Sequence, residues 1–199
     1  MTWALIAANN HTTAASLLYP RGFNIPQFKT TPHDPDQSPL NYAVSNRNPE
    51  MVKILLEAGS LVDQCTPLAC GMHNRTSSCH PPRTPLQLAA EEGYLDMIDI
   101  VLKARANVNA PVGEVEGATA LQIAAIKGFI GIAKLLLDLG ADPNAPRAHE
   151  FGRTALEGAA EYGRIDMIEL LLRSGVEILS AGTGDSICAR LSLLRDGGI

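Results

Sequence analysis

Residues 84–90 read Thr-Pro-Leu-Gln-Leu-Ala-Ala, residues 119–125 read Thr-Ala-Leu-Gln-Ile-Ala-Ala, and residues 154–160 read Thr-Ala-Leu-Glu-Gly-Ala-Ala. The three segments align without a gap, 35 residues apart, and a glycine follows each at the same offset (Gly93, Gly128 and Gly163). An apolar run comes after each glycine. Self-similarity at a fixed period of this length is typical of repeat proteins. The chain is therefore predicted to be a stack of copies of one unit.

The chemistry of each copy predicts two short helices joined by a turn. The threonine hydroxyl can cap the first backbone N–H groups of a helix, and the glycine suits the left-handed position that ends one. Leucines and alanines at helical spacing form an apolar face that one unit cannot bury alone but a stack can. We expect an all-α fold in which Leu121 and Leu156 are fully buried. The predicted helices span 39–46, 49–58, 85–92, 95–104, 120–127, 130–139, 155–162 and 165–174.

Further copies extend the array in both directions. One starts at Ser38, 46 residues before Thr84, so about 11 residues are inserted there. A weaker copy starts at Thr2, and a partial copy at 189–199 has Leu194 and Arg195 where the others have two alanines. Because these bulky residues would block another unit, the partial copy is predicted to cap the array; a longer array is left open. The copies are predicted at about 2–37, 38–83, 84–118, 119–153, 154–188 and 189–199, within one domain covering 1–199.

These motifs resemble the ankyrin repeat. The closest lines are residues 84–90 and the stretch Leu-Leu-Asp-Leu-Gly-Ala-Asp-Pro-Asn at 136–144. The resemblance implies a helix–turn–helix solenoid with about five repeats, of which the first is degenerate and the last is a half-repeat cap. The histidine usual in the motif is replaced by Asn41, Gln87, Gln122 and Glu157. We expect this replacement to weaken a local hydrogen-bond network without changing the fold.

The same resemblance implies a protein-interaction module rather than an enzyme. It implies that another protein binds to a concave face formed by the first helices and the hairpin loops. Aromatic and arginine side chains at the variable positions would be the energetic anchors, as they are at other interfaces. The variable positions carried over to this chain are Arg83, Glu91, Glu92, Glu116, Ile126, Lys127, Glu150, Phe151, Arg153, Glu161 and Tyr162.

The insertion at 64–82 holds three of the four cysteines and two of the five histidines. Thiolates and imidazoles in one short loop could bind zinc. The spacing of Cys65, Cys70, His73 and Cys79 matches no recognised zinc-finger pattern. We therefore predict no metal or cofactor and expect a polar loop that enlarges the binding face. The alternative is a small-molecule or metal site, possibly catalytic, between the insertion and the concave face.

Charge and composition narrow the class of partner and the compartment. A net charge of −5 argues against nucleic acid, since proteins that bind it carry a basic face. No apolar run approaches the roughly 18 residues needed to cross a bilayer, so no membrane is expected. The first residues lack the basic region of a signal peptide, and the four cysteines are irregularly spaced. We expect a monomer inside the cell, in the cytoplasm or the nucleus.

Overall fold

The computed structural model describes residues 6–7, 9–18, 38–64, 83–111, 117–149 and 151–177, and the regular structure in these ranges is entirely α-helical. This confirms the predicted fold class. All eight predicted helices are present, with ends within one residue of the prediction. The helices are α2 (Thr12–Leu18), α3 (Pro39–Ser45), α4 (Pro49–Glu57), α5 (Pro85–Glu92), α6 (Leu95–Lys103), α7 (Ala120–Lys127), α8 (Ile130–Asp138), α9 (Ala155–Glu161) and α10 (Ile165–Arg173).

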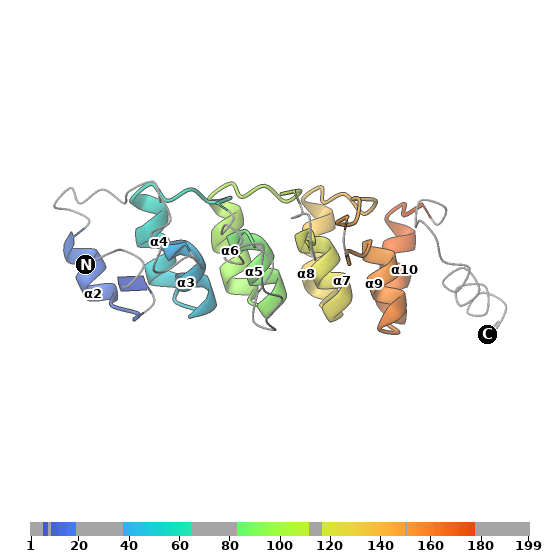
Figure 1. Ribbon diagram of the computed structural model, residues 1–199, viewed down its shortest axis with the longest axis horizontal. Helices are drawn as coiled ribbons and strands as arrows, with labels where there is room; N and C mark the ends of the chain where they lie inside the picture. The colour runs from blue at the N-terminus through green and yellow to red at the C-terminus, as the bar shows by residue number, and fades with distance from the viewer. Residues whose placement is uncertain are drawn as a thin grey trace, which may run out of the picture.

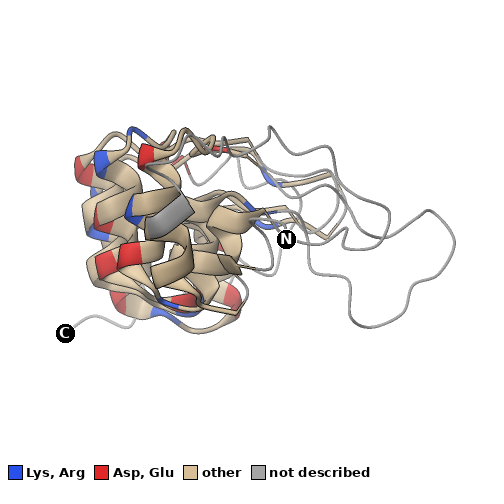
Figure 2. Ribbon diagram, turned by 90° about the vertical axis from the view of Figure 1, so that its left-hand side faces the viewer, with Lys and Arg blue, Asp and Glu red and all other residues tan. Residues whose placement is uncertain are grey.

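The helices form two layers along one row. The first helices of successive copies pack on one another, α3 on α5, α5 on α7 and α7 on α9 (Figure 1). The second helices lie behind them, where α4 packs on α6 and α8 on α10. Seen along the row, the connecting loops project from one side of both layers (Figure 2). We call the surface that α5, α7 and α9 share with the described parts of loops 104–119 and 139–154 the inner face.

The predicted start and stop signals of the first helices are present. The hydroxyl of Thr119 accepts a hydrogen bond from the backbone N–H of Gln122 (3.2 Å), and the Gln122 side chain accepts one from the N–H of Thr119 (2.9 Å). The same reciprocal pair begins α5 and α9. Gly128 ends α7 in the left-handed region, at φ 82°. α5, α7 and α9 therefore begin with the same capping chemistry every 35 residues, whereas α3 has only the bond from the Asn41 N–H to the Ser38 hydroxyl.

The expected weakening of the hydrogen-bond network is wrong for Gln87 and Gln122, because both make bonds that join neighbouring copies, whereas at Asn41 the side-chain oxygen is buried without a partner. Gln122 is 1% exposed, and its Nε2 donates to the carbonyls of Ala145 (2.9 Å) and Pro146 (3.1 Å) in the next loop. Gln87 makes the equivalent bonds at 3.4 and 3.5 Å. A glutamine side chain is long enough to serve the helix cap with its oxygen and the next copy with its nitrogen.

The core repeats with the sequence period. Leu121 and Leu156 are each 1% exposed, which confirms their predicted burial. Fully buried methionines recur in the second helices as Met51, Met97 and Met167. The loops are joined by a second set of side-chain bonds. Asn109 and Asn144 illustrate it, since each accepts from a backbone N–H and donates to a backbone carbonyl of the following copy.

Two arginines stand in left-handed positions where other copies have glycine. Arg47 (φ 47°) lies in the register of Gly93, and Arg105 (φ 66°) in that of Gly140. Arg47 also reaches the next copy, because its guanidinium lies 3.3 Å from a carboxylate oxygen of Asp96. A residue with a Cβ in this conformation costs about 1–2 kcal/mol relative to the right-handed region. These turns therefore keep their shape despite an unfavourable residue.

The first copy is shifted by one residue from the predicted alignment. The N–H of His11 donates to the carbonyl of Ile6, and the equivalent bond in the second copy runs from Asn48 to Ala43. Ile6 and Ala7, rather than Ala7 and Ala8, therefore occupy the register of the paired alanines. The cysteine–histidine segment from 65 to 82 and the partial copy at 189–199 lie outside the described residues.

Candidate functional site

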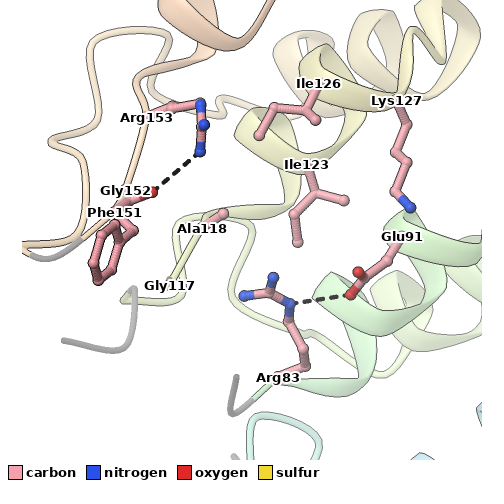
Figure 3. A pocket seen from close by; sticks show the side chains of 10 residues that line it. All are labelled: Arg83, Glu91, Gly117, Ala118, Ile123, Ile126, Lys127, Phe151, Gly152 and Arg153. Carbon is pink, nitrogen blue, oxygen red and sulfur yellow. Dashed lines mark hydrogen bonds and ion pairs between the residues drawn. The ribbon is translucent and has the colours of Figure 1, made fainter. Parts of the chain in front are cut away.

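A depression of about 390 Å³ lies on the inner face, between the first helices and the projecting loops. We call it the notch. Its floor is apolar, and charged side chains and one aromatic ring surround it (Figure 3). The residues that line it are Arg83, Glu91, Gly117, Ala118, Ile123, Ile126, Lys127, Phe151, Gly152 and Arg153.

The notch exists because one copy breaks the pattern of its two neighbours. In the copies on either side, an arginine before the first helix pairs with a glutamate near that helix's end: Arg83 with Glu91, and Arg153 with Glu161. In the copy between them, the same two positions are Ala118 and Ile126. Short apolar side chains thus replace an ion pair, and they leave a space with a charged pair at each end.

The two flanking ion pairs differ in exposure, but hydrogen bonds hold the arginine of each. Arg83 Nε lies 3.1 Å from Glu91 Oε2, and the Arg83 side chain is only 12% exposed. Arg153 bonds Glu161 through Nε and through Nη2, and its Nη1 donates to the carbonyl of Phe151 (3.2 Å). The hydrogen bonds to Glu161 raise the pKa of Arg153 above its ordinary value, although partial burial opposes them. Both guanidinium groups are held in place by these bonds.

The floor is shaped by a missing side chain. Gly158 lies inside α9 in the register of Leu88 and Ile123. A Cβ built on Gly158 would lie 2.4 Å from Cγ1 of Ile126, so Ile126 occupies the space that a side chain at position 158 would fill. Glycine in a helix interior costs about 1 kcal/mol relative to alanine. The close approach of Ile126 explains why a glycine stands at position 158 despite this cost.

Phe151 forms the loop-side rim of the notch. Its side chain is 64% exposed, and its backbone lies in the left-handed region at φ 56°. The next residue is Gly152, where a Cβ would lie 2.3 Å from the backbone nitrogen of Ala148. The turn is thus too tight for any residue but glycine at 152, and it presents an aromatic ring to solvent. Large exposed aromatic side chains often mark interaction surfaces.

The structure brings together most of the candidate partner-binding residues. Six line the notch, and a seventh, Glu161, pairs with one of them. Glu92 and Tyr162 are exposed but do not line it, while Glu116 and Glu150 lie outside the described residues. The notch-lining residues that we did not predict are Gly117, Ala118, Ile123 and Gly152. Ala118 could have been found by comparing its register with that of the two arginines.

Two other classes of site have no counterpart in the described ranges. No group of three or more histidine, cysteine, aspartate or glutamate side chains is placed there to hold a metal ion. The described helices are seven to nine residues long, and none of them is long and apolar enough to span a bilayer. The predictions about a metal in the insertion concern residues 65–82, outside these ranges.

Comparison with known families identifies the repeat. A family model described as ankyrin repeats in three copies matches residues 65–147 and 112–181. A second, described as an ankyrin repeat, matches residues 35–64. Together they cover most of the chain. No curated protein matches the sequence.

Proposed function

Because the chain belongs to the ankyrin-repeat family, whose members generally serve as protein-interaction modules and are typically not enzymes, we propose that it binds an extended segment of a partner protein along its inner face. The segment crosses α5, α7 and α9, and one of its apolar side chains enters the notch. The partner is a protein rather than a nucleic acid or a membrane. This chain acts as a monomer inside the cell.

The observation that carries this proposal is the replacement of an ion pair by Ala118 and Ile126 between two copies that keep the pair. Ile126 packs over Gly158 of the next copy, but the fold does not depend on an apolar pair at these two positions, because both neighbouring copies accommodate an ion pair there. It does create an apolar space that a partner side chain can fill. Filling it would remove apolar surface from water at about 25 cal/mol per Å², while contacts between the partner and the rim would exclude water from its edges.

Phe151 and Arg153, on the rim of the notch, also support binding of a partner protein there. Phe151 exposes most of its ring beside an apolar floor, and Arg153 is fixed next to it by Glu161. Aromatic and arginine side chains are enriched among the residues that contribute most to binding. Because the Arg153 guanidinium is already oriented, little of its conformational entropy is lost when a partner docks. We therefore expect Phe151 to be a principal contact.

The test is a selection from a displayed library of random twelve-residue peptides, made on the folded chain. The decisive variant is Ala118→Arg/Ile126→Glu, which gives the middle copy the ion pair of its neighbours and so fills the notch. Peptides selected on the parent should bind this variant at least tenfold more weakly, although its helical circular dichroism should be unchanged. The control Glu169→Ala/Arg173→Ala removes an exposed pair on α10 and should bind like the parent. Equal binding by the filled variant would reject the proposal.

A further inference from the structure

We infer that the bound segment carries an acidic residue within two positions of its apolar anchor, and that Lys127 selects it. This inference rests on the proposed function, since it specifies the partner of the same site. It concerns charge rather than shape, and it follows from which cations around the notch are already paired.

The described residues that line the notch carry three cations and one carboxylate, a formal charge of +2 in a chain whose net charge is −5. Counting Glu161, which pairs with Arg153 just outside the notch, leaves +1. The inner face is thus locally positive at the point where the apolar space lies. A positively charged rim favours an anionic partner group and repels a cationic one.

Lys127 is the cation available to such a group. It is the last residue of α7, it is exposed, and it forms no ion pair with any described residue. The Arg153 guanidinium, by contrast, is occupied by Glu161 and by the carbonyl of Phe151. Arg83 is held by Glu91. A partner carboxylate would therefore gain most by pairing with Lys127, on the rim opposite Phe151 (Figure 3).

The spacing of the array fixes where the acidic residue falls. Packed helices lie about 8–10 Å apart, and an extended segment advances about 3.3 Å per residue. One helix therefore corresponds to about three residues of the partner. A segment with its apolar anchor over α7 places the residues about three positions away opposite the two ion pairs. Lys127 belongs to α7 itself, so its carboxylate partner lies one or two positions from the anchor.

The loops that border the notch also contain acids. Glu114 and Glu116 precede Gly117, and Glu150 precedes Phe151, and all three lie outside the described residues. If these acids dominated the local potential, the preferred partner would be basic instead. The test therefore includes the variant Glu114→Gln/Glu116→Gln/Glu150→Gln, in which only the charges of the described rim remain.

The same twelve-residue library is selected in parallel on the parent, on Lys127→Glu and on the triple glutamine variant. Peptides enriched on the parent should share an apolar residue with Asp or Glu within two positions. Lys127→Glu should replace that acid with Lys or Arg, and the triple variant should keep it. For one enriched peptide, Lys127→Ala should weaken binding about two- to fivefold, as for an exposed ion pair. The matched change Lys134→Ala, on the neighbouring helix α8, should have no effect.

The outcomes separate this inference from the proposed function. Enriched peptides that need an open notch but show no acid, or show a basic residue, would refute the inference and leave the proposed function intact. An acid that appears only with the triple variant would also refute it. Peptides that bind the filled variant Ala118→Arg/Ile126→Glu as well as the parent, or no enrichment on any form, would count against both.

Discussion

Gln122 provides the sharpest test of how neighbouring copies are held together. The substitution Gln122→Glu keeps an oxygen to accept the N–H of Thr119 but removes the donor to the carbonyls of Ala145 and Pro146. A carboxylate would then face the carbonyl oxygens of buried Ala145 and of Pro146. Glu157 occupies the same register and has Arg147 nearby, at 3.6 Å. At position 122 no such cation is available by register, because Val112 stands where Arg147 does.

The structure sets the size of the effect. Gln122 is 1% exposed, and its two bonds are short, at 2.9 and 3.1 Å. Leaving buried partners unsatisfied costs about 1–3 kcal/mol, and an uncompensated charge adds to this. We expect Gln122→Glu to lower the free energy of unfolding by about 2–4 kcal/mol at pH 7. Gln87→Glu should cost only about 1–2 kcal/mol, because the corresponding bonds are 3.4 and 3.5 Å.

The pH dependence of this loss has a definite sign. A protonated carboxyl can donate to the Ala145 carbonyl, so folding favours the protonated form and raises the pKa of the new carboxyl above the ordinary value of about 4.3. The deficit relative to the parent should be largest at neutral pH and should shrink as pH falls through the raised pKa. The measurement is urea unfolding followed by circular dichroism, for parent and variants, at several pH values from 7 to 4. A loss below about 0.5 kcal/mol at pH 7, a deficit independent of pH, or a larger loss for Gln87→Glu would refute the reasoning.

Three further predictions concern the core, a strained turn and the insertion. Leu121→Ala and Leu156→Ala should each lower the free energy of unfolding by about 2–5 kcal/mol in urea titrations; a loss under about 1 kcal/mol at both sites would contradict their place in the core. Arg105→Gly should raise stability by about 0.5–1 kcal/mol, because relief of the left-handed backbone outweighs the added entropy of the unfolded chain; a destabilised variant would show that the arginine side chain itself contributes. Protein purified without chelator should contain no stoichiometric metal by elemental analysis, whereas one zinc per chain, lost in Cys65→Ser/Cys70→Ser, would favour a metal site in the insertion.

The sequence was sufficient for the parts of the fold that depend on local chemistry. The threonine caps, the glycine ends and the 35-residue period place every predicted helix within one residue. The same local reasoning failed where a residue adopts a backbone conformation that its type disfavours, or where its side chain bonds to another copy. Arg47 is an arginine in the register of Gly93, so its residue type alone gives no sign of the left-handed backbone, and the bond from the Gln122 side chain to the next loop requires the stacking of two copies.

The candidate site was predictable as a set of variable positions but not as a shape. The register shows that Ala118 and Ile126 replace an arginine and a glutamate, and this much can be read from the period alone. The packing of Ile126 over Gly158 and the outward turn at Phe151 depend on contacts between copies. Tyr162, which seemed equivalent to Phe151 as an anchor, is exposed but does not line the notch.

Hydrogen–deuterium exchange on the complex with a selected peptide tests the central claim most directly. The account predicts slower exchange of backbone amides in residues 117–127 and around 151–153. It predicts little change in α6 and α8, which are second helices and lie behind the inner face. The filled variant Ala118→Arg/Ile126→Glu should show no such protection at the same peptide concentration. Protection confined to α6 and α8, with the inner face exchanging as in the free chain, would contradict binding at the notch.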